Sequence, residues 1–142
     1  MAGLTAELWL LKRMSPVYRV YPWQSLINAC CNGVSNTDYG KALMREIMMT
    51  YDGDKDRYVD IAGGGYLMLA EACEKDLPYE LPEQSLLICG TKDRTGSTRR
   101  YNRNWHKKAG IPIEWIEGAG HNSNTDAPDT VNHIIEDFVL KL

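Results

Sequence analysis

The chain has 142 residues and a formal net charge of -3 at pH 7, with 44% hydrophobic and 25% charged residues. This length and composition predict a folded chain with an ordinary hydrophobic core and exclude a disordered one. The absence of a basic excess argues against a surface that binds nucleic acid or another polyanion.

Two further features bear on cofactors and location. The four cysteines, at positions 30, 31, 73 and 89, have no C-x-x-C spacing and predict neither a zinc site nor a disulfide framework. Residues 1–7 carry an acidic residue where a signal peptide needs positive charge, and no apolar run reaches membrane-spanning length. We therefore expect a cytoplasmic chain that holds no cofactor or metal and binds no membrane.

The first part of the chain, residues 1–80, predicts helices only. Periodicity and capping residues predict helices over 5–14, 22–33, 37–51 and 54–75. Asn36 or Thr37 is the expected cap of the third helix. Three consecutive glycines, residues 63–65, make a continuous fourth helix unfavourable, so we expect a break or kink there. These glycines lack the spacing of a phosphate-binding loop.

The second part, residues 81–142, follows a linker at 77–82 that two prolines keep extended. Its pattern predicts a strand, a helix, a strand, a turn and a helix over 85–90, 96–109, 112–117, 118–125 and 127–141. Asp126 is the expected N-cap of the last helix. A strand, a helix and a second strand of these lengths form a crossover between parallel strands, which indicates an α/β fold.

Two residues in this part have the chemistry of a catalytic pair. Asp93 follows the first strand, and His121 follows the second in a glycine-rich turn. Loops at the carboxyl ends of parallel strands meet at one edge of a sheet, where catalytic side chains collect. Asp93 and His121 would then supply the acid and base of a Ser-His-Asp triad. The alternative is that Asp93 caps the following helix and His121 only hydrogen-bonds backbone.

The same region resembles the C-terminal third of an α/β-hydrolase. The resemblance is carried by residues 86–93 (LLICGTKD), 118–122 (GAGHN) and 126–129 (DAPD), in that order. It implies that Asp93 is the triad acid, which orients the imidazole, and that His121 is the general base and then the general acid. It also implies a partial α/β-hydrolase fold, with a helical cap-like region over residues 1–80 and a β-α-β-α part of the core over 81–142.

The family's nucleophile is not found in this sequence. In the family a serine lies in a G-x-S-x-G elbow upstream of the acid and the histidine. None of the serines here has the flanking glycines; they are Ser15, Ser25, Ser35, Ser85, Ser97 and Ser123. We therefore expect the serine and the oxyanion hole to be encoded before residue 1. The intact form would hydrolyse an ester or related acyl bond of a small molecule, and this chain alone would have little such activity.

The resemblance also implies that the family's strand beside 85–90 is absent from this chain, and this absence has a structural consequence. It would leave one edge of the strand at 85–90 unpaired, and a two-stranded sheet with such an edge is marginal. We expect that edge to pair in a homodimer or with an N-terminal hydrolase fragment. Two alternatives to a portion of a hydrolase stay open. The chain is a non-catalytic remnant that serves as a dimerisation or ligand-binding module, or it is one half of a split hydrolase.

One other group of residues has a defined pattern. Arg99, Arg103 and Lys107 are spaced as a basic stripe on the helix predicted at 96–109. A solvated helix face explains this stripe, and an anion or RNA site is the alternative.

Overall fold

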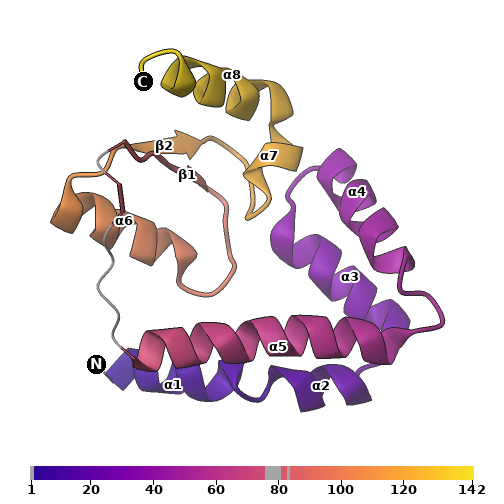
Figure 1. Cartoon of the computed structure of the whole chain (residues 1–142). Helices are drawn as coiled ribbons and strands as arrows, with labels where there is room; N and C mark the ends of the chain where they lie inside the picture. The colour runs from indigo at the N-terminus through magenta and orange to yellow at the C-terminus, as the bar shows by residue number, and fades with distance from the viewer. Residues whose placement is uncertain (1, 76–80, 83) are drawn as a thin grey trace. The chain divides into compact units, whose positions relative to one another are not determined.

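The structure is a computed structural model that describes residues 2–75, 81–82 and 84–142. Residues 77–80 of the predicted linker lie outside the described residues. The described chain is mostly helical with one small parallel sheet (Figure 1). The elements in order are α1 (Ala2–Leu11), α2 (Met14–Val20), α3 (Trp23–Val34), α4 (Asp38–Met49), α5 (Lys55–Glu74), β1 (Leu87–Gly90), α6 (Thr98–Ala109), β2 (Ile113–Ile116), α7 (Ser123–Asp126) and α8 (Pro128–Val139).

The chain forms two compact units, and both are discontinuous in sequence. The first comprises Met1–Ile27 and Ile47–Glu80, and the second comprises Asn28–Glu46 and Leu81–Leu142. This grouping differs from the division into residues 1–80 and 81–142 that the sequence suggests. The end of α3, the start of α4 and the turn between them belong with the β-strands.

In the first unit α5 packs along α1 and α2 (Figure 1). Its buried side chains come from three helices and include Leu26, Ile27, Met48 and Val59. The sequence predicted one helix through Met14, but α1 ends at Leu11 and α2 begins at Met14. Pro16 accounts for the difference, because its ring excludes the helical carbonyl four residues earlier, whereas proline is tolerated in the first turn of a new helix.

The predicted break at residues 63–65 is wrong, because α5 is continuous from Lys55 to Glu74. Gly63 is buried, and a Cβ built on it would lie 2.6 Å from the Cβ of Ser15 in α2. The missing side chain thus allows α2 and α5 to approach closely. Helix packing outweighs the low helix propensity of the glycines, which is about 1 kcal/mol for each one.

Side-chain hydrogen bonds identify the N-caps of two helices. The Asp54 side chain accepts a hydrogen bond from the Arg57 amide and caps α5. Between the two candidates for α4, Thr37 is the cap, because its Oγ1 accepts from the Gly40 amide at 3.1 Å. Gly110 follows α6 directly, has a φ of 70° and ends the helix in the left-handed region, in agreement with the predicted end at residue 109.

In the second unit β1 and β2 pair in parallel, with Leu87 opposite Ile113 and Gly90 opposite Ile116. Helix α6 contacts β1 and α8 contacts β2, and the two strands lie between these helices in Figure 1. Ile116, Ala119 and Val131 form the buried core of this unit. The parallel crossover predicted from the sequence is therefore present, with strands shorter than predicted by one or two residues at some ends.

Among the described helices, none combines the length and the apolar character needed to cross a lipid bilayer.

The contact at Gly63 gives a stability prediction with a matched control. Gly63→Ala should lower the free energy of unfolding by about 1–3 kcal/mol, because its Cβ overlaps Ser15 of α2. Gly64→Ala should raise it by about 0.5–1 kcal/mol, because a Cβ there meets nothing within 4 Å and alanine favours the helix. Urea unfolding followed by circular dichroism measures both. Equal effects of the two substitutions would contradict the packing described here.

Candidate functional site

The two loops that follow β1 and β2 are joined by hydrogen bonds. The Lys92 amide donates to the Ala119 carbonyl at 2.9 Å, and the Gly118 amide donates to Thr91 Oγ1 at 2.9 Å. The Thr91 amide also donates to the Ile116 carbonyl at 3.0 Å, which continues the pairing of the strands. These bonds hold the loop that contains Asp93 against the loop that contains His121.

Gly90, the last residue of β1, is needed for this close approach. A Cβ built on it would lie 2.1 Å from the Gly120 carbonyl oxygen and 2.3 Å from that of Ala119. Both neighbours are backbone atoms and do not move as a flexible side chain would. Any larger residue at position 90 would therefore displace the loop that contains His121.

Asp93 and His121 are brought together as the sequence predicted. Their side chains meet with Nδ1 of His121 2.9 Å from Oδ2 of Asp93. The other oxygen of Asp93, Oδ1, accepts from the Thr95 amide at 2.7 Å, and the Asp93 side chain is only 2% exposed. The N-cap residue of α6 is Ser97, so Asp93 is not a helix cap. His121 binds a carboxylate, so the backbone alternative does not describe it either.

This hydrogen bond determines which nitrogen of the neutral imidazole carries the proton. A carboxylate oxygen accepts hydrogen bonds, so the proton lies on Nδ1 and the lone pair of the neutral ring lies on Nε2. The His121 side chain is 39% exposed, and no described residue hydrogen-bonds to Nε2. Nε2 of the neutral ring therefore has no partner among the described residues and has the lone pair that a general base requires.

A second aspartate, Asp126, fixes the backbone beside His121. Its Oδ2 accepts from the amides of Gly120 and Asn36 at 2.7 and 2.8 Å. Its Oδ1 accepts from Thr37 twice, at 3.1 Å from the amide and at 2.8 Å from Oγ1. One carboxylate thus connects the turn before α4 to the turn that presents the histidine.

The prediction that Asp126 caps the last helix is wrong. Pro128 is the first residue of α8, so the N-cap position belongs to Ala127, and Asp126 lies one residue too early. Its carboxylate turns to the backbone of other segments instead. The position of Pro128 is the signal in the sequence that excludes Asp126 as a cap.

The hydrogen bonds of Asp126 also set its ionisation. Burial by itself raises the pKa of this carboxyl, but hydrogen bonds from Gly120, Asn36 and Thr37 outweigh burial and lower the pKa below its ordinary value of 3.8. Asp126 is therefore the charged member of the network throughout the neutral range.

The turn at residues 34–37 is the part of the site that sequence reasoning missed. The Asn36 side chain donates to the Gly118 carbonyl at 2.7 Å, and the Asn122 amide donates to the Val34 carbonyl at 2.8 Å. These two bonds hold the histidine loop in addition to the bonds that Asn36 and Thr37 form with Asp126. No short motif marks such a contact, because more than 80 residues separate its two sides.

No described serine hydroxyl is hydrogen-bonded to His121. The most buried serine is Ser35, which is 3% exposed and whose Oγ has no hydrogen-bond partner among the described residues. That oxygen lies beside Gly40, because a Cβ built on Gly40 would be 3.0 Å from it. Ser35 therefore faces the start of α4.

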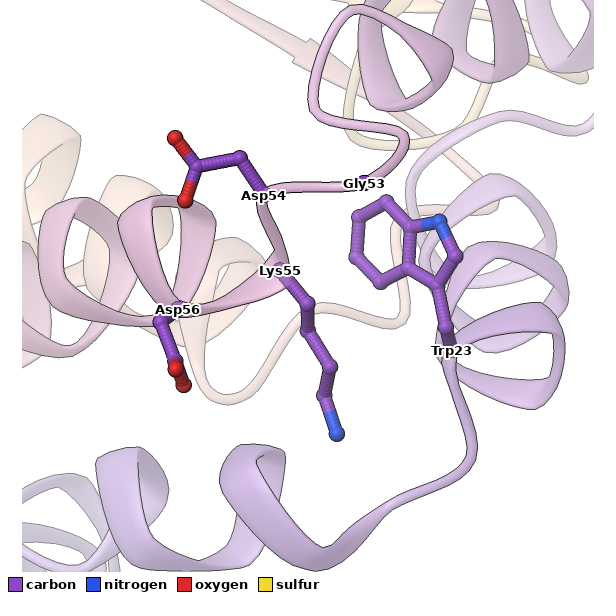
Figure 2. Close-up of a pocket in the computed structure, with 5 residues that line it drawn as sticks. All are labelled: Trp23, Gly53, Asp54, Lys55 and Asp56. Atoms are coloured by element: carbon purple, nitrogen blue, oxygen red, sulfur yellow. The ribbon is translucent and has the colours of Figure 1, made fainter.

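A hollow of about 400 Å³ occurs in the first unit, at the start of α5. Figure 2 shows the Trp23 ring beside the backbone of Gly53, with the carboxylates of Asp54 and Asp56 turned away from the ring. Lys55 is already engaged, since its Nζ donates to the carbonyls of Arg19 and Tyr21 at 2.6 Å. The residues that line this hollow include no histidine, serine or cysteine, and the described residues contain no cluster of three potential metal ligands.

Comparisons of the chain with known protein families, with curated proteins and with solved structures find no match.

The network around Asp126 gives a prediction that depends on pH. Asp126→Asn should lower the free energy of unfolding by about 2–3 kcal/mol at pH 7. The NH2 group of the asparagine side chain then replaces one carboxylate oxygen and faces N–H donors that it cannot accept from. The folded-state pKa is lowered, so this stabilisation is present above the ordinary pKa of 3.8 and is lost as the pH falls through the folded-state pKa. The difference between wild type and variant should therefore shrink below about pH 4.

Chemical unfolding at several pH values measures this difference. Glu114→Gln, at an exposed position of β2, is the control and should change the free energy of unfolding by less than about 0.5 kcal/mol. A difference between wild type and Asp126→Asn that stays constant down to about pH 2 would show that the charge of Asp126 does not stabilise the fold.

Proposed function

We propose that this chain supplies the acid and the base of a serine hydrolase of the α/β-hydrolase type. In this proposal Asp93 orients His121, and His121 transfers protons to and from a serine that lies outside this sequence. The substrate is a small molecule with an ester or related acyl bond. The single observation that carries the proposal is the hydrogen bond between His121 Nδ1 and a buried oxygen of Asp93.

Three features of the pair support an acid-base role over a purely structural one. The carboxylate is buried and held by a second hydrogen bond, so it fixes the orientation of the ring. The His121 side chain is 39% exposed, and no described residue hydrogen-bonds to the opposite nitrogen of the ring. Both residues follow parallel strands at their carboxyl ends, where α/β proteins collect catalytic side chains.

The proposed reaction uses His121 twice. Nε2 takes the proton of the serine hydroxyl as the serine oxygen attacks the acyl carbon, and the resulting imidazolium gives that proton to the departing alcohol. Water then attacks the acyl-serine, with Nε2 again as the base, and the serine regains its proton when the acid leaves. Asp93 keeps its negative charge and stabilises the imidazolium that forms in each half of the reaction.

The unpaired edges of the sheet support the proposal that a further strand, from outside this sequence, pairs with β1. Within the described residues β1 and β2 pair only with each other, so each has an edge of unpaired backbone groups. A sheet of two strands is marginal alone, and a further strand beside β1 would complete it. That strand comes from the hydrolase half that contains the nucleophile. In the alternative, a non-catalytic module, it comes from a second copy of this chain.

An esterase assay tests the proposal. The chain alone should not be labelled by a fluorophosphonate probe and should hydrolyse p-nitrophenyl acetate no faster than free imidazole at the same concentration. After mixing with, or fusion to, the polypeptide encoded immediately upstream, provided that this contains a G-x-S-x-G segment, labelling and ester hydrolysis should appear. His121→Ala should then lower kcat by about 10⁴-fold or more.

His133→Ala is the matched control, because His133 lies on α8 with a side chain that is 73% exposed. It should leave the esterase activity unchanged. If the complemented protein hydrolyses the ester equally well without His121, the acid-base role is wrong. If no upstream polypeptide confers activity, the chain is a non-catalytic module.

A further inference from the structure

A second hollow lies beside Asp93, at the start of α6. Its volume is about 360 Å³, and four arginines line it together with Asp93: Arg94, Arg99, Arg100 and Arg103. We call it the arginine pocket. Four guanidinium groups around one hollow repel one another, and such an arrangement is stabilised when an anion enters.

The charge of the surrounding segment is opposite to that of the whole chain. Residues 91–110 contain seven lysines and arginines and one aspartate, a net charge of +6, whereas the chain carries -3. A solvated helix face of an acidic protein usually mixes the two signs of charge along the helix. Here α6 contains no acidic residue at all.

The acidic group in the pocket does not neutralise these arginines. Asp93 uses Oδ2 for His121 and Oδ1 for the Thr95 amide, and its side chain is 2% exposed. Within the described part of the chain, Arg94, Arg99 and Arg103 form no ion pair with any carboxylate. Their positive charge is therefore directed to the pocket and to solvent.

Three of the guanidinium groups contact uncharged groups, and Arg100 does so through Nη2, which donates to Ser97 Oγ at 2.8 Å. Arg99 Nη1 donates to the carbonyl of Thr91 at 2.7 Å, and Thr91 lies in the same loop as Asp93, after β1. The Arg103 guanidinium lies 5.1 Å from the centre of the Trp115 ring, in a cation–π contact. Each guanidinium has five N–H donors, so these contacts orient the group and leave donors for a ligand.

We propose that the arginine pocket binds the phosphate group of a small molecule, free or as a phosphate monoester. A phosphate monoester carries nearly two negative charges at pH 7 and three acceptor oxygens, which suits several guanidinium forks better than a single carboxylate does. The pocket is confined to the N-terminal part of α6 and the loop that precedes it. It therefore takes one phosphate group, whereas a nucleic acid needs an extended basic surface.

This inference does not depend on the proposed hydrolase activity. Phosphate binding uses the guanidinium groups, whereas hydrolysis uses Nε2 of His121. His121→Ala should therefore leave phosphate binding intact, so the failure of one proposal is distinguishable from the failure of the other. If both proposals hold, either the substrate carries a phosphate group near its acyl bond, or a separate phosphate-bearing molecule regulates the enzyme.

Calorimetric titration of the full chain tests the proposal. Inorganic phosphate and phenyl phosphate, each at constant ionic strength, should bind with saturation below about 10 mM, and acetate should not. Tighter binding of phenyl phosphate than of inorganic phosphate indicates that the natural ligand is a monoester. Arg94→Gln should weaken binding of phenyl phosphate about tenfold. Arg94 is exposed, so this substitution should leave the folding of the chain unchanged.

A control separates a defined site from general attraction by positive charge. The double substitution Lys107→Gln and Lys108→Gln removes two charges from the other end of α6 and should change affinity by no more than about twofold. Arg94→Lys keeps the charge but loses the fork, and it should fall between wild type and Arg94→Gln. No saturable binding of either phosphate, or equal weakening by the lysine pair, would overturn the proposal.

Discussion

The carboxylate of Asp126 is the interaction on which the second unit depends. Its oxygens accept four hydrogen bonds from three residues, Asn36, Thr37 and Gly120, which lie at two places far apart in the sequence. The α3–α4 turn and the loop after β2 are joined at that point. Because Gly120 directly precedes His121, this carboxylate also fixes the backbone from which the imidazole extends.

Two constraints then act on the same histidine. The backbone is held by Asp126 and by the contact with Gly90, and the side chain is held by Asp93. A base that is positioned before substrate binds loses little conformational entropy in the reaction, which is the physical basis of catalytic preorganisation. Asp93 also lines the arginine pocket, so the same loop carries the proposed acid and part of the proposed anion site.

Local signals in the sequence predicted most elements and the Asp93–His121 pair. Both strands, the cap at Thr37 and the end of α6 at Gly110 depend on neighbouring residues, so periodicity and capping rules find them. The failures have long-range causes. Gly63 is helical because Ser15 packs against it, and Asp126 binds a turn about 90 residues away. Neither partner is visible to rules that consider one segment at a time.

We infer that Asp93 holds the neutral imidazole of His121 with its proton on Nδ1, which leaves the lone pair on Nε2. The most direct measurement is the nitrogen chemical shifts of His121 in a long-range ¹H–¹⁵N correlation spectrum, at a pH where the ring is neutral. The account predicts a protonated nitrogen at Nδ1 and an unprotonated one at Nε2, with the tautomer lost in Asp93→Ala. A predominant Nε2–H tautomer in the wild-type chain would contradict it.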